Sequence, residues 1–353
     1  MAIPARPVVR GPADAPTSVV IQALEAVDAG ERPLVVDEGS GQLAAHLHAR
    51  GAEPQVWRRF AGRGDTAVPW PQVESATSAF VRLGKDRRAL AMALHAAAGV
   101  VAPGAIIVLF GANAEGVKSA GKALEEVAEG VITVDTRRHS RVLAGRRRAE
   151  ISGLRTTLES WREVHEITLN GRARPWVSYP GVFAGGALDP GTALLLAHLP
   201  PIAAGAAVLD MACGSGIIGA AVREQFAEAA VDLVDNDAVA IAAARENVPG
   251  ANIICGDGLA PAPRTRYDVI LSNPPIHDGV AENFAFLQGL IAEAPARLKP
   301  GGVLQVVIQS RIRALPWFEA AYKEAAIVAQ DRRYQIIRGI AGSVAKTNRR
   351  GAR

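Results

Sequence analysis

The ten residues 210–219, DMACGSGIIG, constrain the fold of this chain more than any other segment. They follow an apolar run that suits a buried strand and lead into a stretch with the apolar spacing of a helix. Gly214 and Gly216 allow the backbone to turn sharply there and a ligand to approach it closely. In α/β folds such turns lie at the carboxyl edge of the sheet, where ligands bind. The segment predicts a Rossmann-like unit, although dinucleotide enzymes share this glycine pattern and a turn without a ligand is the alternative.

The rest of the second half alternates short apolar runs with helical stretches. Strands are predicted at 207–212, 231–235, 252–257, 267–273 and 301–309, and helices at 217–226, 237–247, 282–298 and 315–324. Two further strands, 326–332 and 334–340, are joined by almost no chain, so they must pair antiparallel. A mostly parallel sheet that ends in an antiparallel hairpin is typical of class I methyltransferases.

The first half has a similar but weaker alternation. Its predicted strands are 33–37, 78–83, 105–110 and 131–134, with helices around 41–50, 86–101 and 115–128. Residues 35–41, VVDEGSG, are a shortened echo of the glycine run. The sequence therefore predicts an α/β protein with two tandem Rossmann-like class I methyltransferase folds, of which the N-terminal one is degenerate. We assign residues 1–150 to that first domain, 151–342 to the catalytic domain and 343–353 to a basic tail.

Three acids at predicted strand ends are candidate ligand contacts. Asp210 opens the glycine run. Asp235 ends the next strand, about 20 residues beyond the run, where an acid can accept hydrogen bonds from ribose hydroxyls. Asp257 ends the third strand and suits an adenine amino group, with a plain turn residue as the alternative.

The triplet Asn273-Pro274-Pro275 follows the fourth strand. Two prolines cannot continue a central strand, and they leave backbone carbonyls without a paired N–H. Asn273 adds a side-chain carbonyl acceptor. Acceptors that converge on one point suit an exocyclic NH₂ group, which is a poor nucleophile until its protons are held and its lone pair is aimed. The triplet predicts methylation of such an amine.

Composition excludes several classes of protein. The chain has 353 residues, two cysteines and a net charge of +4. It shows no apolar run long enough to cross a bilayer, no secretory leader and no disulfide framework. No His, Cys or Asp cluster has the spacing of metal ligands, so we expect no metal. We expect a cytoplasmic monomer. Basic clusters lie at 137–141, at Arg146, Arg147 and Arg148, and at 346–350. Such clusters suit contacts with a polyanion, and solvated surface is the alternative interpretation.

Together these motifs give the chain a specific resemblance. The segments that carry it are 180–183 (PGVF), 188–192 (LDPGT), the glycine run and 273–279 (NPPIHDG), with weaker matches at 110–120 and 137–138. The chain resembles the tandem-domain ribosomal RNA guanine-N2 methyltransferases, whose catalytic half is the "small" methyltransferase domain. The resemblance implies S-adenosyl-L-methionine as cofactor and guanine N2 of ribosomal RNA, preferably 16S rRNA, as target, with the RNA or a ribosomal subunit as partner.

The resemblance also implies roles for single residues. Phe183, Asp189 and Thr192 would line the methionine end of the cofactor, and residues 273–275 would hold the guanine amine. Relatives usually carry an aromatic residue where this chain has Ile276, so we expect another ring, such as Phe183 or Phe284, to stack on the base. Ile276 and His277 are candidate substrate contacts. The alternatives are methylation of adenine N6 in RNA, methylation of a protein glutamine, and a catalytically silent RNA-binding assembly factor.

Overall fold

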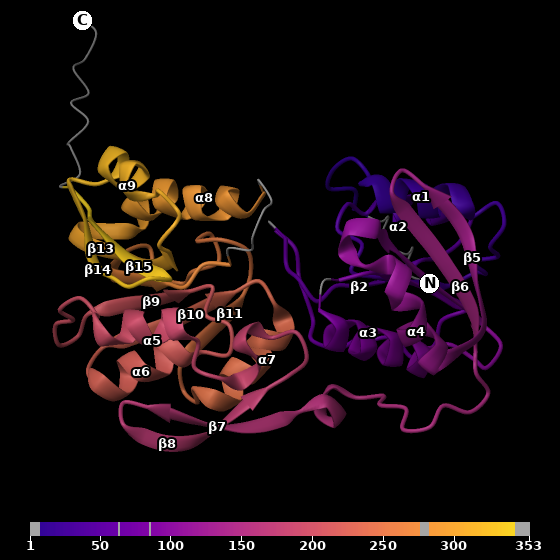
Figure 1. Ribbon diagram of the computed structural model, residues 1–353, viewed down its shortest axis with the longest axis horizontal. Helices are drawn as coiled ribbons and strands as arrows, with labels where there is room; N and C mark the ends of the chain where they lie inside the picture. Colours follow the sequence, from indigo (N-terminus) through magenta and orange to yellow (C-terminus); the bar gives the residue numbers. More distant parts are fainter. Residues whose placement is uncertain (1–7, 63, 85, 276–281, 343–353) are drawn as a thin grey trace, which may run out of the picture. The chain divides into compact units, whose positions relative to one another are not determined.

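The computed structural model describes residues 8–62, 64–84, 86–275 and 282–342, and it divides into two compact units (Figure 1). The N-terminal unit comprises Met1–Phe60, Ala67–Glu163 and Tyr179–Gly181, and the C-terminal unit comprises Ala61–Thr66, Val164–Ser178 and Val182–Arg353. The main stretch of the N-terminal unit ends at Glu163. The sequence suggested a domain boundary after residue 150, which is 13 residues earlier. The basic tail lies outside the described residues.

The N-terminal unit is built on a mixed sheet with strand order β2-β1-β3-β4-β6-β5. The first four strands of this order are parallel, and β6 pairs antiparallel with both β4 and β5. The strands are β1 (Pro33–Val36), β2 (Gln55–Trp57), β3 (Ser78–Arg82), β4 (Ile106–Ala112), β5 (Ala128–Arg137) and β6 (Ser140–Arg147). The helices are α1 (Ala15–Ala23), α2 (Gln42–Ala49), α3 (Arg87–Val100), α4 (Val117–Val127) and the short η1 (Asn113–Glu115).

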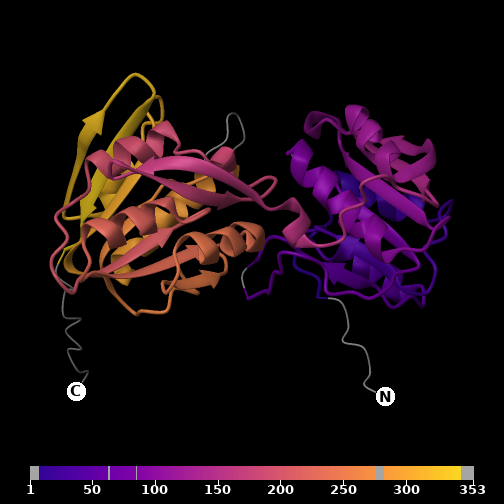
Figure 2. The ribbon, with the colours of Figure 1, turned by 90° about the horizontal axis from the view of Figure 1, so that it is seen from below.

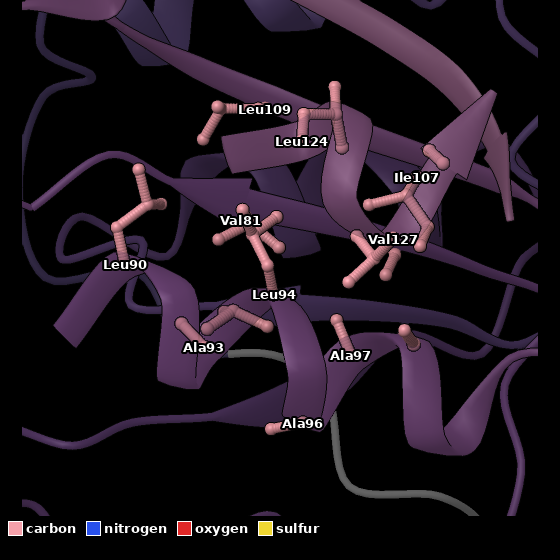
Figure 3. Close-up of a cluster of buried hydrophobic side chains, with 14 of the residues drawn as sticks. Val81, Leu90, Ala93, Leu94, Ala96, Ala97, Ile107, Leu109, Leu124 and Val127 are labelled. Atoms are coloured by element: carbon pink, nitrogen blue, oxygen red, sulfur yellow. The ribbon is translucent and has the colours of Figure 1, made fainter. Parts of the chain in front are cut away.

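Alternate side chains of this sheet supply two separate cores. Val81, Ile107 and Leu109 pack against α3 and α4 on one face, where Leu94 and Leu124 are fully buried (Figure 3). Val35, Phe80, Val108 and Phe110 pack against α1 and α2 on the other face. Because helices bury both faces of the sheet, its strands are continuous apolar runs and do not alternate apolar with polar residues.

Three elements of this unit were not predicted: α1, β2 and the second strand of the β5–β6 hairpin. Helix α1 begins at a local signal, because Asp14 caps it by accepting a hydrogen bond from the Thr17 amide at 2.8 Å. The hairpin turns at Arg138 and His139, whose φ angles are 48° and 55°. Neither residue is the Asn or Gly that usually marks such a turn, so the sequence signal was weak.

The C-terminal unit contains a sheet with strand order β11-β10-β9-β12-β13-β15-β14, and it confirms the predicted parallel sheet with a terminal antiparallel hairpin. Its strands are β9 (Ala207–Met211), β10 (Ala230–Asp235), β11 (Asn252–Cys255), β12 (Tyr267–Ser272), β13 (Leu298–Gln309), β14 (Glu324–Gln330) and β15 (Tyr334–Ile340). Its helices are α5 (Pro190–Ala197), α6 (Ile217–Gln225), α7 (Ala238–Asn247), α8 (Glu282–Arg297) and α9 (Leu315–Ala321).

Helices cover both faces of this sheet (Figure 1). Leu287, Ile291 and Phe318 of α8 and α9 pack on one face. Leu195, Ile218 and Ile241 of α5, α6 and α7 pack on the other. Because both faces are buried, ligands have access only at the strand ends, and the glycine run lies at the carboxyl end of β9.

A separate two-stranded ribbon, β7 (Glu163–Leu169) and β8 (Arg172–Ser178), completes this unit, together with the 3₁₀ turn η3 (Phe183–Gly186). The 3₁₀ turn η2 (Leu158–Trp161) belongs to the N-terminal unit. Figure 2 shows the ribbon lying across the helices of the C-terminal unit. This ribbon was not predicted from the sequence. The signal for the ribbon was Asn170-Gly171, which turns with φ angles of 48° and 77° and is the strongest short hairpin signature.

The two sheets share one topology. If β11 is removed from the outer edge of the C-terminal sheet, the remaining order matches that of the N-terminal sheet, strand for strand, including the antiparallel pair at the other edge. This correspondence supports the interpretation of residues 35–41 as a degenerate copy of the glycine run. Among the described residues, no helix combines the length and the hydropathy that a membrane crossing requires.

Candidate active site

The glycine run forms the predicted turn between β9 and α6. Ala212, Gly214 and Gly216 all have positive φ, at 57°, 54° and 90°. A Cβ on Gly216 would lie 2.7 Å from a methyl carbon of Val248, so this glycine permits close packing of the helix on its neighbours. A Cβ on Gly214 would meet nothing within 4 Å. The backbone at Gly214 therefore borders open space, as a turn that receives a ligand requires.

Asp210 and Asp235 hold this turn in place. One carboxylate oxygen of Asp210 accepts a hydrogen bond from the Gly219 amide at 2.8 Å, and its other oxygen is buried without a partner in the described residues. Asp235 accepts from the amides of Gly214 and Asp237, both at 2.8 Å. Asp235, predicted as a ligand contact, therefore lies at the glycine turn and also stabilises it through these hydrogen bonds.

Both acids have raised pKa values. Burial raises the pKa of Asp210 to about 7, with a smaller contribution from the charge of Asp235, while the Gly219 amide opposes the shift. Burial, and then the charge of Asp237, raises the pKa of Asp235 to about 6. Hydrogen-bond donors from a ligand favour the charged carboxylates, so this edge of the sheet suits a ligand that is rich in hydroxyls or carries positive charge.

A support that was not predicted from the sequence lies behind the turn. Trp176 of β8 is buried, and its indole N–H donates to the Ser215 hydroxyl at 2.9 Å. Asn247 donates through Nδ2 to the carbonyls of Ser215 at 3.1 Å and Val177 at 2.9 Å. The β7–β8 ribbon thus positions the glycine turn, which explains why Trp176 and Val177 near its end are apolar and buried.

Asp257 lies just beyond the end of β11. Asp235 and Cys255 are register partners, so Asp257 follows a strand end that adjoins the end of β10. It is partly buried. Its role at an adenine amino group stays a prediction.

Cys213 and Cys255 are both free thiols.

Asn273 stands beside the glycine turn because Ser272 is the register partner of Met211, and the Ser272 hydroxyl donates to the Met211 carbonyl at 2.7 Å. The Asn273 side-chain NH₂ donates to Asp189 Oδ2 at 3.2 Å and to Thr192 Oγ1 at 2.9 Å. Pro274 is buried and Pro275 is exposed. The structure therefore brings the predicted Asn273, Asp189 and Thr192 together at the carboxyl edge.

The other predicted site residues have different settings. Phe183 begins η3 and is 55% exposed, as an aromatic residue that contacts a ligand requires. Phe284 is 37% exposed, and its ring packs edge-on to Trp317 with the centroids 6.2 Å apart. Ile276 and His277 lie outside the described residues. Within the described ranges, no group of three or more His, Cys, Asp or Glu side chains is arranged to hold a metal ion.

The three arginines predicted to contact RNA belong to the N-terminal unit, at and after the end of β6. Arg146 is exposed. Arg147 Nε donates to the Ala98 carbonyl at 3.2 Å, and Arg148 Nε donates to the Glu125 carbonyl at 3.0 Å. These carbonyls lie in the last turns of α3 and α4, where cations are favourable. Arg147 and Arg148 therefore have a structural role in addition to any contact with RNA.

The turn of the N-terminal unit that corresponds to the glycine run is covered by its own chain. The Arg10 amide donates to the Ser40 carbonyl at 2.8 Å, and Gln42 Nε2 donates to the Gly11 carbonyl at 2.8 Å. A Cβ on Gly41 would lie 2.1 Å from the Val8 carbonyl oxygen. Residues 8–11 thus lie where a ligand would approach the backbone.

Comparisons with known proteins agree with this geometry. Residues 175–338 match the family model "Methyltransferase small domain", and residues 37–163 match "Methyltransferase small domain N-terminal". Ribosomal RNA small subunit methyltransferase C of Pseudomonas putida KT2440 is 34% identical over 314 residues, which are 86% of this chain and 92% of that protein. The protein of the same name from Alcanivorax borkumensis SK2 is 30% identical over 342 residues, covering 92% and 98%.

A solved structure has the same fold over nearly its full length. It is the 16S rRNA N2 G1207 methyltransferase (RsmC) of T. thermophilus in complex with AdoMet and guanosine, with a TM-score of 0.82, 23% sequence identity, and coverage of 95% of this chain and 94% of that one. The two-unit architecture, the two family models and the relatives at 30% identity and above lead to one assignment. The chain belongs to the ribosomal RNA small subunit methyltransferase C family.

Proposed function

We propose that this chain transfers the methyl group of S-adenosylmethionine to the exocyclic N2 amine of a guanine in 16S ribosomal RNA. The observation that carries the proposal is the placement of Asn273 beside the glycine turn by the pairing of β12 with β9. The names of the Pseudomonas and Alcanivorax relatives, and the guanosine complex of the T. thermophilus enzyme, support the same target.

The residues of the carboxyl edge fit the cofactor. Gly214 leaves open space at the turn, and Asp235, which is partly exposed, offers an acceptor beside it. Asp210 is buried behind the turn with one oxygen unpartnered among the described residues. In this proposal Asp235 binds the ribose hydroxyls and Asp257 the adenine amine, while Phe183 lies along the methionine end. When bound, S-adenosylmethionine supplies an electrophilic methyl group on a sulfonium.

Asn273 and the proline carbonyls perform the chemistry that this chain itself contributes. In the proposal, the amine donates one proton to Asn273 Oδ1 and the other to a carbonyl of the 273–275 segment. Both bonds draw the nitrogen lone pair out of conjugation with the ring and aim it at the methyl carbon. The N–C bond would form as the bond between the methyl carbon and the sulfonium sulfur breaks, with a neutral thioether as the leaving group. Positive charge would then develop on the amine, and the two acceptors would stabilise it until a proton leaves to solvent. The base must be extruded to reach this edge.

Transfer of radiolabelled methyl from S-adenosylmethionine to total RNA and to total protein tests the proposal. We expect label in RNA, in the small subunit fraction, and N2-methylguanosine after digestion to nucleosides. Label in N6-methyladenosine or in protein glutamine would replace the proposed substrate with one of the other amines. RNA binding without any transfer would favour a silent assembly factor.

Cofactor binding should weaken as the pH falls. The pKa of Asp235 is raised to about 6, and ribose hydroxyls bind its charged form better, so binding lowers that pKa and releases a proton in acid. Below about pH 6 the affinity should fall by up to about tenfold per pH unit, and above about pH 7 it should level off. Calorimetry in buffers of different ionisation enthalpy measures both effects. A constant affinity between about pH 5 and 7.5 would contradict the role of Asp235.

We further propose that the N-terminal unit helps to hold the RNA through its basic hairpin. Replacing Arg146, Arg147 and Arg148 by glutamine should weaken RNA binding and reduce the slope of log affinity against log salt by up to about three. Because Arg147 and Arg148 bind helix carbonyls, thermal unfolding must be measured alongside. Arg223→Gln is the matched control, since Arg223 of α6 donates to the Pro249 carbonyl in the same manner. Equal salt slopes for the wild type and the triple variant would show that these arginines do not contact phosphate.

A further inference from the structure

The side-chain amide of Asn273 is held by two specific acceptors. Its nitrogen donates to Asp189 Oδ2 at 3.2 Å and to Thr192 Oγ1 at 2.9 Å. A primary amide has two N–H donors and one carbonyl oxygen in a single plane. Both N–H donors of Asn273 are bound to Asp189 and Thr192, so the NH₂ end of the amide faces these two residues. The carbonyl oxygen Oδ1 therefore points away from them.

Of the two acceptors, Asp189 decides which way the amide faces. A threonine hydroxyl donates or accepts and would tolerate either orientation. An ionised carboxylate only accepts, so turning the amide by 180° would place Oδ1 against Asp189 Oδ2 and leave two acceptors face to face. The negative charge of Asp189 therefore selects the orientation with Nδ2 inward.

Asp189 and Thr192 are themselves fixed by the start of α5. Asp189 caps this helix, and its Oδ2 also accepts from the Thr192 amide at 3.0 Å. Thr192 is 5% exposed. Gly191 lies between them, and a Cβ on it would lie 2.9 Å from Asp189 Oδ2 and 3.0 Å from the ring of Tyr334. The segment 189–192 thus builds a rigid pair of acceptors in which only glycine fits at the third position.

We propose that Asp189 and Thr192 are positioning residues that hold the Asn273 amide with its carbonyl oxygen presented to the substrate amine. This inference rests on the proposed function, because only an amine substrate needs that oxygen. With the amide reversed, Nδ2 would meet the amine donor to donor and the acceptor would be lost. The pair therefore acts on turnover through Asn273, in place of the contact with the methionine end of the cofactor that the resemblance implies.

Two substitutions remove one acceptor each. Thr192→Val keeps the size of the side chain, and Asp189→Ala removes the carboxylate. Both should lower kcat by about 10- to 100-fold, since the amide loses its fixed orientation, with the Kd for S-adenosylmethionine changed by less than about threefold. Thr192→Ser retains the hydroxyl acceptor and should keep most of the turnover, whereas Asp189→Asn can face the Asn273 amide with either its oxygen or its NH₂ group and should lose turnover as Asp189→Ala does. Asp86→Ala is the matched control, because Asp86 caps α3 through the Ala89 amide at 2.7 Å and has no part in the site.

A second measurement needs neither substrate nor cofactor. In protein labelled with ¹⁵N-asparagine, the Nδ2 protons of Asn273, identified by their loss in Asn273→Ala, should exchange slowly with water in the wild type and rapidly in Thr192→Val. Rapid exchange in the wild type, or full turnover in both Thr192→Val and Asp189→Ala, would overturn the inference. A loss of turnover matched by a similar loss of cofactor affinity would also overturn it. A wild type that methylates no amine would overturn the proposed function instead, and the exchange experiment would still test the orientation of the amide.

Discussion

Methyl transfer by an Asn273→Ala variant is expected to fall by about 10²- to 10³-fold, the usual effect of removing one preorganised group from a charged transition state. The substitution removes the acceptor proposed to hold the substrate amine and leaves the turn between β9 and α6 unchanged. Binding of S-adenosylmethionine should therefore stay within about threefold of the wild type, which corresponds to less than 1 kcal/mol.

Single-turnover transfer to RNA, with cofactor calorimetry on the same preparation, measures this separation of turnover from binding. Asn252→Ala is a suitable control, because Asn252 begins β11 at the opposite edge of the sheet and its side chain makes a long hydrogen bond, of 3.4 Å, to Asp232. Retained transfer within a few-fold of the wild type would remove Asn273 from the mechanism.

An Asp235→Ala variant should bind S-adenosylmethionine more weakly by about 1.5–3 kcal/mol, or roughly 10- to 150-fold. Two losses contribute to this value. A charged acceptor for ribose hydroxyls disappears, and the amides of Gly214 and Asp237 lose their common partner, so the glycine turn is less well held.

Calorimetry separates these two losses when a control variant is included. Asp331 also accepts hydrogen bonds from two backbone amides, those of Arg333 and Tyr334, in the turn between β14 and β15. Asp331→Ala therefore reports on the loss of such a turn support without the loss of a ligand contact.

The same titration should give one cofactor per chain, because residues 8–11 cover the corresponding turn in the N-terminal unit. Unchanged affinity in Asp235→Ala would show that another acid binds the ribose, and a stoichiometry of two would show that both units bind the cofactor.

Much of the C-terminal unit was predictable because its signals are local. The apolar runs of β9, β10 and β12 and the glycines of residues 210–219 depend on periodicity and on backbone conformation, which each segment expresses by itself. The parallel alternation then places all strand ends at one edge, so the approach of Asn273 to the glycine turn followed from the order of the elements. The N-terminal unit was harder to predict, since β6 is basic at its end and turns at Arg138 and His139, which lack a hairpin signature.

The sequence by itself determined the fold class, the position of the ligand-binding turn and the chemical type of the residues around it. Only the tertiary structure decided what those residues contact. Asp189 precedes Asn273 by 84 positions, and no periodicity relates a helix cap to a side chain that far along the chain. Arg147 and Arg148 likewise donate to carbonyls at the ends of α3 and α4, which lie far from them in the sequence. Hydrogen bonds act over about 3 Å, so their partners are fixed by how the elements pack in space, and a sequence pattern specifies only which groups are available to donate or accept.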